Sequence, residues 1–550
     1  MSTALIHSRA QLGLRAPEVS VEVHLPNGLP GFTSTGITGG ELRDRVKSAI
    51  QNSAFEFPAG RIVVNLGPAE LPKSGGRYDL AIAAGILVAS EQLPAVLLTN
   101  IDLLGELSLF GDIRPVRGAL IAAREALSAG RKILCPTDNQ QEFEGGSPST
   151  SSDGIKLISH LNQLATIQGL PTPSSKPQRS TWRKSHPLHQ VIGQDRAKRA
   201  LTIAAAGGHH MLMSGPPGAG KTMLAERLRD LLPPLNPDSR AEVAEIYSLS
   251  GLRAPPGGNA PFRAPHHSAS SAALTGGGSP PMPGEISYAH RGVLFMDEMP
   301  EFRRDLIEAL REPMEAGRIR ISRRGFAVAY PARFQLVAAM NPCPVGLACK
   351  PINCRCPPDQ AQRYKNRISA PILDRIDLHI DVQPVALTSL LRQSPLQGAP
   401  KQEALGQETT GQQALERDCD TTEDAGSAGD TADRDTPPAE YLLAIERARQ
   451  LQFERSQCLN AHLDPSQTQT WCRCTPQAIP LLKQAAERLE LSARGYFRAL
   501  RVARTITDLD AVGEGLFTKS DKSAGEKSMP HQPITEQAIT EALGYRVLSS

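Results

Sequence analysis

The sequence has few aromatic residues and little excess charge of either sign. Phe, Trp and Tyr together make up 4% of its 550 residues, and the formal net charge is +3. A balance this close to neutrality excludes a strongly basic or acidic chain, so any contact with nucleic acid must come from local basic patches. With 40% apolar residues the chain can still build sizeable cores, and its length suits about three or four domains.

Cysteines and long apolar runs are also scarce. The nine cysteines are an odd number and occur singly or in pairs, which is unlike the disulfide framework of a small secreted protein. The first 20 residues contain no hydrophobic signal-peptide core. The longest apolar stretch, residues 80–89, is too short to cross a bilayer. We therefore expect a soluble cytoplasmic protein with no membrane partner.

The most informative stretch is residues 215–222, which read Gly-Pro-Pro-Gly-Ala-Gly-Lys-Thr. They match G-x-x-x-x-G-K-[ST], a phosphate-binding loop whose backbone N–H groups surround phosphate oxygens. An apolar run at 210–213 predicts a strand before the loop, and 223–232 predict a helix after it. We expect Lys221 to reach the β- and γ-phosphates of ATP and Thr222 to bind Mg²⁺. The predicted ATP-binding residues are Gly215, Pro216, Pro217, Gly218, Ala219, Gly220, Lys221 and Thr222.

Three polar residues at the ends of apolar runs are predicted to complete this site. The run at 292–296 ends in Asp297 and Glu298. Asp297 would hold Mg²⁺, and Glu298 would polarise the attacking water as the general base. Asn341 follows the apolar strand expected at 334–340, where an amide can orient that water.

Two arginines are candidates for completing the site. Arg375 follows a short helix and precedes a strand, a position suited to an arginine finger supplied to a neighbouring subunit. An ordinary surface pair with Asp374 is the alternative. In the basic amphipathic helix expected at 493–506, Arg494 is the candidate for sensing the nucleotide, and Arg498 is the second choice.

Two basic segments contain no acidic residue, namely 248–284 and 317–331. The first is long and irregular, so it is either functional or a flexible surface loop. The second reads as a β-hairpin in which clustered arginines repel one another, and a phosphate backbone would relieve that repulsion. The predicted DNA-binding residues are Arg263, His266, His267, Arg318, Arg320, Arg323 and Arg324.

Four cysteines follow the predicted strand that ends at Asn341. Four thiolates can form a tetrahedral zinc site, yet the spacing C-x₅-C-x₄-C-x-C is not a standard zinc pattern. Scattered reduced thiols are therefore the alternative to bound Zn²⁺. The cysteines concerned are Cys343, Cys349, Cys354 and Cys356.

The expected organisation is α/β and multidomain. Residues 1–140 predict a compact α+β domain, and 141–187, rich in Ser, Pro, Gly and Gln, predict a linker. An ATPase core is expected over 188–385. A low-complexity insert over 386–438 is expected to be disordered, and 439–550 are expected to be helical.

Together these segments resemble the ComM (YifB-like) family of bacterial proteins, relatives of magnesium-chelatase ATPase subunits. The resemblance covers most of the chain outside the linker and the insert. One departure is Val345, which stands where a second cysteine of a C-x-C pair is expected. The motifs that carry the resemblance are residues 19–32, 215–222, 262–267, 292–298, 341–344, 373–378 and 501–505.

The resemblance implies a central AAA+ P-loop α/β domain of the helix-2-insert branch with a C-terminal helical lid. Val191 and Ile192 match the segment that packs on the adenine of ATP in AAA+ proteins. The segments 248–284 and 317–331 would then project into the pore of a hexamer, the second as the hairpin before sensor 1, the position of Asn341.

The N-terminal domain resembles the Lon-protease-like fold (ribosomal S5 domain 2-like) through residues 71–76 and 105–118. However, residues 75–89 contain no serine, and Leu120 stands where we place the catalytic lysine. A nucleophile needs its activating base. Because both are missing, we expect an assembly or DNA-guiding module rather than a protease.

The resemblance implies an ATP-dependent hexameric ring DNA helicase or translocase. It would promote branch migration and DNA integration during natural transformation, with single-stranded or branched DNA and further copies of itself as partners. The alternative is a magnesium-chelatase-type motor for metal insertion or protein remodelling. An ATPase that DNA stimulates and salt weakens would favour the first function.

Overall fold

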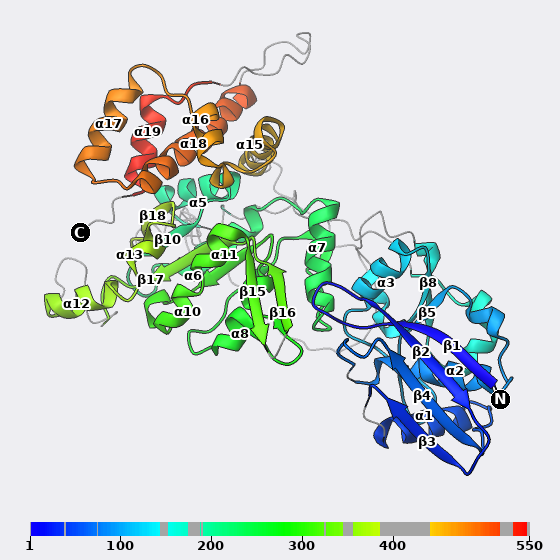
Figure 1. Cartoon of the computed structure of the whole chain (residues 1–550). Helices are drawn as coiled ribbons and strands as arrows, with labels where there is room; N and C mark the ends of the chain where they lie inside the picture. The colour runs from blue at the N-terminus through cyan, green and yellow to red at the C-terminus, as the bar shows by residue number, and fades with distance from the viewer. Residues whose placement is uncertain are drawn as a thin grey trace, which may run out of the picture.

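The computed structural model describes residues 2–37, 40–73, 75–143, 152–173, 188, 191–323, 326–344, 356–385, 440–517 and 532–546. Figure 1 shows three parts that follow one another along the chain: an N-terminal domain in blue and cyan, a central domain in green and a C-terminal helical domain in orange and red. The insert predicted over 386–438 lies outside the described residues.

The N-terminal domain is built on a seven-stranded sheet of order β3-β4-β2-β1-β5-β8-β9. Helix α2 is buried along almost its whole length because nearly all its residues are apolar. It packs on β1, β2 and α1. The strands are β1 (Ser2–Arg9), β2 (Glu18–Leu25), β3 (Gly31–Thr35), β4 (Arg61–Gly67), β5 (Ile101–Leu103), β8 (Lys132–Pro136) and β9 (Ile155–Ile158). The main helices are α1 (Gly40–Asn52), α2 (Asp79–Ala89) and α3 (Ala119–Ser128), and α4 (Gln140–Phe143) follows β8.

The prediction of a linker over 141–187 is wrong for its middle part. Strand β9 pairs in parallel with β8 and forms an edge of the sheet. The 3₁₀ segment η5 (Leu161–Gly169) then buries Leu161, Leu164 and Ile167 in the same core. These apolar side chains stand between polar, small-residue stretches, so the overall composition hid them. Residues 144–151 and 174–187 lie outside the described residues.

The strands between residues 101 and 114 belong to two different sheets. Strand β5 joins the large sheet in parallel between β1 and β8. Strand β6 (Glu106–Leu107) instead forms a small antiparallel ribbon with β7 (Ile113–Arg114).

The central domain has a five-stranded parallel sheet of order β11-β14-β17-β10-β18. Its inner strands are almost wholly apolar and buried, as expected for a parallel sheet covered on both faces. The strands are β10 (Met211–Ser214), β11 (Phe262–Arg263), β14 (Val293–Met296), β17 (Gln335–Met340) and β18 (Leu378–Asp381). The helices are α5 (Asp195–Gly207), α6 (Lys221–Leu231), α7 (Pro237–Ser248), α8 (Ser271–Thr275), α9 (Glu285–Tyr288), α10 (Arg304–Glu308), α11 (Arg311–Ala316), α12 (Pro358–Lys365) and α13 (Ala370–Leu373).

Two hairpins extend from this sheet. The predicted hairpin over 317–331 is present as β15 (Arg318–Arg323) and β16 (Phe326–Pro331), which pair antiparallel. The segment 248–284 is less irregular than expected, because it contains α8 and a short ribbon of β12 (Gly276–Gly277) and β13 (Met282–Pro283). The two hairpins are in contact through β12 and β15.

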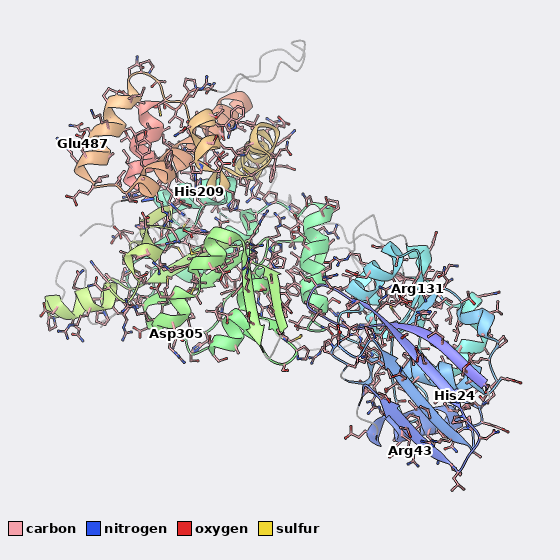
Figure 2. All side chains as sticks on the ribbon, viewed as in Figure 1. His24, Arg43, Arg131, His209, Asp305 and Glu487 are labelled. Carbon is pink, nitrogen blue, oxygen red and sulfur yellow. The ribbon has the colours of Figure 1, made fainter. Side chains whose placement is uncertain are left out.

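The C-terminal domain is a helical cluster that sits on the central domain (Figure 1). Helices α15 and α18 pack on α5, and α18 packs on α19. Buried His209 lies at this junction (Figure 2), where its ring contacts Asp377 and Thr505. The helices are α15 (Glu440–Ser456), α16 (Pro465–Trp471), α17 (Ala478–Arg488), α18 (Ala493–Phe517) and α19 (Glu536–Gly544). None of the described helices is long and apolar enough to cross a membrane.

The N-terminal domain contacts the central domain at α7 and at the β15–β16 hairpin. The backbone N–H of Gly118 donates to the Ser248 carbonyl at 2.8 Å, and the Ser248 hydroxyl donates to the half-buried Glu142 carboxyl. Gly13 has φ +57°, and a Cβ atom there would lie 2.4 Å from a methyl of Val328. A glycine is therefore required where this turn meets the hairpin.

Candidate nucleotide-binding site

The phosphate-binding loop lies between β10 and the first residue of α6, as the motif requires. Gly218 and Gly220 adopt φ values of +79° and +88°, which L side chains rarely allow. The loop thus leads its N–H groups to the N-terminus of an eleven-residue helix, a favourable place for phosphate.

Lys221 lies among polar acceptors of the loop and of β17. Its ammonium donates to the carbonyls of Gly215 at 2.7 Å and Pro216 at 3.1 Å, and to Asn341 Oδ1 at 3.0 Å. Burial lowers the pKa of Lys221, while Asp297 and Glu298 act in the opposite direction. The structure therefore brings together the predicted lysine, the predicted amide and the acidic pair.

The predicted magnesium ligands are in direct contact. Thr222 Oγ1 donates to Asp297 Oδ2 at 2.9 Å, although the two residues come from different elements. The carboxyl ends of parallel strands meet at one edge of the sheet, which explains this meeting. Hydroxyl and carboxylate oxygens are the ligands that Mg²⁺ prefers, so these side chains fit the ion that the loop motif implies.

Glu298 has a strained backbone and a histidine neighbour. Its φ and ψ are 50° and 44°, a left-handed conformation that is uncommon for a non-glycine residue. His267 Nδ1 lies 4.0 Å from Glu298 Oε2, and the His266 ring lies against the His267 ring at 4.1 Å. The acid-free segment 248–284 therefore reaches the predicted general base.

The segment predicted to pack on adenine is held to the loop by Gln194. Its amide donates to the carbonyls of Ala219 at 2.8 Å and Gln383 at 3.2 Å. Val191 is buried and Ile192 is half-buried. Sequence reasoning missed the role of Gln194, whose left-handed φ of 57° gives no signal in a single sequence.

Arg375 lies away from the phosphate-binding loop of its own subunit. Strands β10 and β18 run in parallel with Met211 beside Leu378 and Ser214 beside Asp381. The loop follows the carboxyl end of β10, whereas Arg375 precedes the amino end of β18. Four strand residues separate the two ends by on the order of 10 Å.

The carboxylate that pairs with Arg375 is Glu315, not the expected alternative Asp374. The Arg375 side chain is 7% exposed, and its Nη2 lies 2.5 Å from Glu315 Oε1. Arg494 Nη2 lies 3.5 Å from the same oxygen, and its side chain is 62% exposed. Arg498 instead forms a 2.7 Å pair with buried Asp377 and donates to the Arg375 carbonyl. The geometry favours Arg494 over Arg498 as the arginine that remains accessible.

The predicted DNA-binding residues fall into two groups. Arg263 is engaged internally, because its Nε and Nη2 each donate to a Glu285 carboxylate oxygen at 2.6 Å and its guanidinium lies over the Tyr288 ring. Glu285 lies one residue beyond the acid-free segment 248–284. The absence of acidic residues within that segment therefore did not reveal this partner of Arg263. We therefore leave Arg263 out of the DNA surface proposed below.

In the β15–β16 hairpin, side chains alternate between the core and the surface. Ile319 and Ile321 are buried, whereas Arg318 and Arg320 are exposed. The residues paired with these arginines across the hairpin are Pro331 and Ala329. This face thus presents positive charge beside small neutral residues. The side chain of Arg323 and the whole of Arg324 lie outside the part of the chain that the structure describes.

The cysteine loop is only partly described. Cys343 is buried, while Cys349 and Cys354 lie outside the described residues. Among the residues that the structure describes, no group of three or more His, Cys, Asp or Glu is placed to hold a metal ion. The zinc site over Cys343 to Cys356 stays a prediction.

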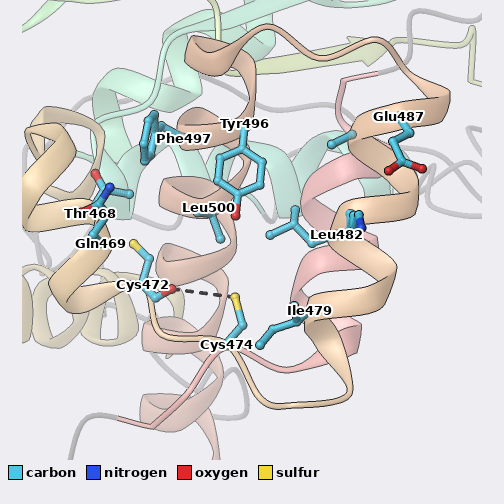
Figure 3. Close-up of a pocket in the computed structure, with 12 residues that line it drawn as sticks. Thr468, Gln469, Cys472, Cys474, Ile479, Leu482, Glu487, Tyr496, Phe497 and Leu500 are labelled. Atoms are coloured by element: carbon cyan, nitrogen blue, oxygen red, sulfur yellow. Dashed lines mark hydrogen bonds between the residues drawn. The ribbon is translucent and has the colours of Figure 1, made fainter.

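The C-terminal domain contains a cleft of about 800 Å³ between α16, α17 and α18 (Figure 3). It is lined only by residues of this domain and is separate from the phosphate-binding loop. Burial raises the pKa of the Cys472 thiol to about 12 and also raises that of Cys474. Both thiols therefore stay protonated near neutral pH.

At the position expected for a protease base, Leu120 is buried in α3. Nearby α2 begins at Asp79, whose carboxylate accepts from Arg45 Nε at 2.9 Å. Burial raises the pKa of Asp79 to about 6, although the Arg45 hydrogen bond opposes this. The Asp79–Arg45 pair ties α2 to α1.

The parallel sheet, the glycine-rich loop and the acidic pair define a P-loop protein of the α/β class. Three family models match the chain: magnesium chelatase subunit ChlI over 187–390, subunit ChlI of Mg-chelatase over 21–139, and the ChlI C-terminal region over 438–514. The matches cover all three domains.

Similarity to individual proteins extends over the whole chain. It is 42% identical to the uncharacterized protein YifB of Escherichia coli strain K12 and 41% identical to the competence protein ComM of Haemophilus influenzae. Each match covers 100% of this chain and 98% of the relative. The magnesium-chelatase 67 kDa subunit of Heliobacterium mobile is 32% identical over 29% of each chain. The chain therefore belongs to the YifB/ComM family of magnesium-chelatase-like proteins.

Proposed function

We propose that this protein is an ATP-driven DNA translocase that works in the cytoplasm as a ring of six copies. It would move single-stranded or branched DNA during branch migration and integration in natural transformation. The observation that carries the proposal is the exposed arginine face of β15, in the same domain as the phosphate-binding loop. The name of the Haemophilus influenzae relative, a competence protein, supports the link to DNA.

Within one subunit, side chains that follow the carboxyl ends of β10, β14 and β17 would carry out hydrolysis. Thr222 and Asp297 would hold Mg²⁺, which when bound neutralises charge on the phosphates. Lys221 would exchange the loop carbonyls for phosphate oxygens. Glu298 would accept the proton of the attacking water, which Asn341 would orient.

Arg375 would act on the nucleotide of a neighbouring subunit, because it precedes the amino end of β18, whereas its own loop follows the carboxyl end of the neighbouring strand β10. Arg494 lies beside it and would approach the same nucleotide from the C-terminal domain, which would serve as the lid. Arg375→Ala should lower ATP turnover by about 10³-fold or more while leaving ATP affinity unchanged. Normal turnover in this variant would show that Arg375 is not the finger.

The DNA part is tested by measuring the ATPase rate with and without single-stranded and forked DNA, alongside the mass of the assembly with ATP. We expect DNA to stimulate hydrolysis and the stimulation to fall as salt rises, because phosphate contacts release counterions. A rate that neither DNA changes would contradict the proposal.

The second candidate is a motor of the magnesium-chelatase type, used for metal insertion or protein remodelling. It is favoured by the match of all three domains to chelatase subunit models. Such a motor would hydrolyse ATP at a rate that DNA does not alter and would require partner subunits. The DNA-dependent ATPase assay therefore distinguishes the two candidates.

A further inference from the structure

One carboxylate, Glu315, contacts both arginines that we assign to the intersubunit site. Arg375 Nη2 lies 2.5 Å and Arg494 Nη2 lies 3.5 Å from the same oxygen, Glu315 Oε1. The two arginines come from the central domain and from α18 of the C-terminal domain. Glu315 itself is 47% exposed, so it lies at the surface where a neighbour would approach.

The Arg375 guanidinium uses its two terminal nitrogens in hydrogen bonds but leaves Nε without a partner. Its Nη1 donates to the Pro371 carbonyl at 2.5 Å, and Nη2 meets Glu315. Its buried Nε has no hydrogen-bond partner. The Arg375 carbonyl accepts from Arg498, which is also paired with Asp377. The backbone is thus anchored, while the guanidinium keeps an unused donor.

Glu315 is also connected to the arginine hairpin. It lies on α11, which is followed by Gly317 in a left-handed conformation with φ +63°. Strand β15 starts at the next residue, Arg318, and α11 packs on β15. A movement of the hairpin would therefore displace Glu315 together with the end of α11.

We propose that Glu315 is a positioning residue that retains Arg375 and Arg494 until DNA on the hairpin releases them. The inference rests on the proposed function, in which Arg375 acts on a neighbour's nucleotide. Glu315 and the γ-phosphate are both anionic acceptors, and Arg375 Nη2 can bond only one of them at a time. Hydrolysis would then depend on the hairpin, since the competing carboxylate lies on α11, just before the hairpin begins.

The test compares Glu315→Gln with Glu312→Gln in the full chain. Glu312 is an exposed carboxylate on the same helix and serves as the matched control. Removing one charge-assisted bond should raise the DNA-free ATPase rate about tenfold. The rate at saturating DNA should stay near wild type, so the stimulation by DNA should fall about tenfold as well. Glu312→Gln should keep the wild-type ratio.

Two results would separate this proposal from the function on which it rests. If Arg375→Ala abolishes turnover but Glu315→Gln leaves the DNA-free rate unchanged or lower, the role of Glu315 is wrong and the finger stands. If Arg375→Ala hydrolyses ATP normally, the finger itself is wrong.

A merely structural role would lower the DNA-free and DNA-stimulated rates together, which the ratio detects. Should Glu315→Gln fail to assemble, Glu315→Asp keeps the charge but withdraws it by one methylene. That variant should raise the DNA-free rate by a smaller factor, about threefold. A wild-type ratio in an assembled Glu315→Asp would also overturn the proposal.

Discussion

At the scale of single residues, the nucleotide site is a set of short contacts between side chains that are far apart in sequence. Lys221 bonds Asn341 and Thr222 bonds Asp297, across 120 and 75 positions. These contacts show what a motif cannot: which side chains the fold brings together beside the phosphate-binding loop.

Glu298 is the residue whose removal should affect chemistry alone. Its side chain is half-exposed, and Asp297 rather than Glu298 contacts Thr222. Glu298→Gln should therefore retain ATP binding and assembly, while the turnover number falls about 10²- to 10⁴-fold, the usual contribution of a general base. Single-turnover hydrolysis and a separate ATP-binding titration measure the two effects. A loss of ATP affinity with unchanged turnover would contradict the assignment.

At the scale of elements, the hairpin shows how far a pattern can specify a surface. Ile and Arg alternate in β15, and in the structure Ile319 and Ile321 are buried whereas Arg320 is exposed. The acid-free segment 248–284 was a weaker guide, since the carboxylate that pairs with Arg263 lies just outside it. A segment chosen because it lacks acidic residues does not reveal which acidic residues outside it pair with its arginines in the fold.

The paired substitution of Arg318 and Arg320 by Ala should weaken DNA stimulation without changing DNA-free hydrolysis. Each arginine that contacts a phosphate of single-stranded DNA contributes roughly 0.7 to the slope of log affinity against log salt. Losing both should reduce that slope by about 1.4. Exposed Arg304 on α10 is the control, and Arg304→Ala should keep the wild-type slope. An unchanged slope in the double variant would place the DNA elsewhere.

Most of the regular elements could be predicted from the sequence, but their pairing could not. Helix α2 follows directly from its continuous apolar run, and the strand, loop and helix around Lys221 follow from the motif. Strand β9 was missed because four residues between polar stretches carry too little periodicity. The meeting of Arg375 and Arg494 on Glu315 depends on how the C-terminal domain sits on the central domain, and no local pattern records this.

At the scale of the whole molecule, the nucleotide-binding domain is held between its two neighbours. The N-terminal domain reaches α7 and the hairpin through Gly13, Gly118 and Glu142. The C-terminal domain rests on α5 and on the end of β18, where His379 donates its backbone N–H to the Tyr545 carbonyl at 2.7 Å. Both surfaces that we assign to partners, the hairpin and the Arg375 edge, thus lie next to a domain junction.

The junction with the C-terminal domain should make the protein sensitive to mild acid. Burial lowers the pKa of His210 to about 3 and that of His379 to about 4, from an ordinary value of 6.5. In the unfolded chain both rings take up protons as pH falls below 6.5, whereas in the folded chain they stay neutral until pH 4 or lower. The contribution of these residues to stability is therefore present above pH 6.5 and is lost as pH falls from 6.5 towards 4.

His379→Gln is a suitable variant, because glutamine keeps a polar side chain beside the backbone of Leu373 and Ile376 but does not titrate. Between pH 6 and 4, one proton fewer should be taken up on unfolding, which makes the slope of unfolding free energy against pH smaller by about 1.4 kcal/mol per pH unit. Denaturant unfolding at several pH values, followed on the full chain, measures this slope. If wild type and His379→Gln show the same slope over this range, the His379 ring is not held neutral at the junction.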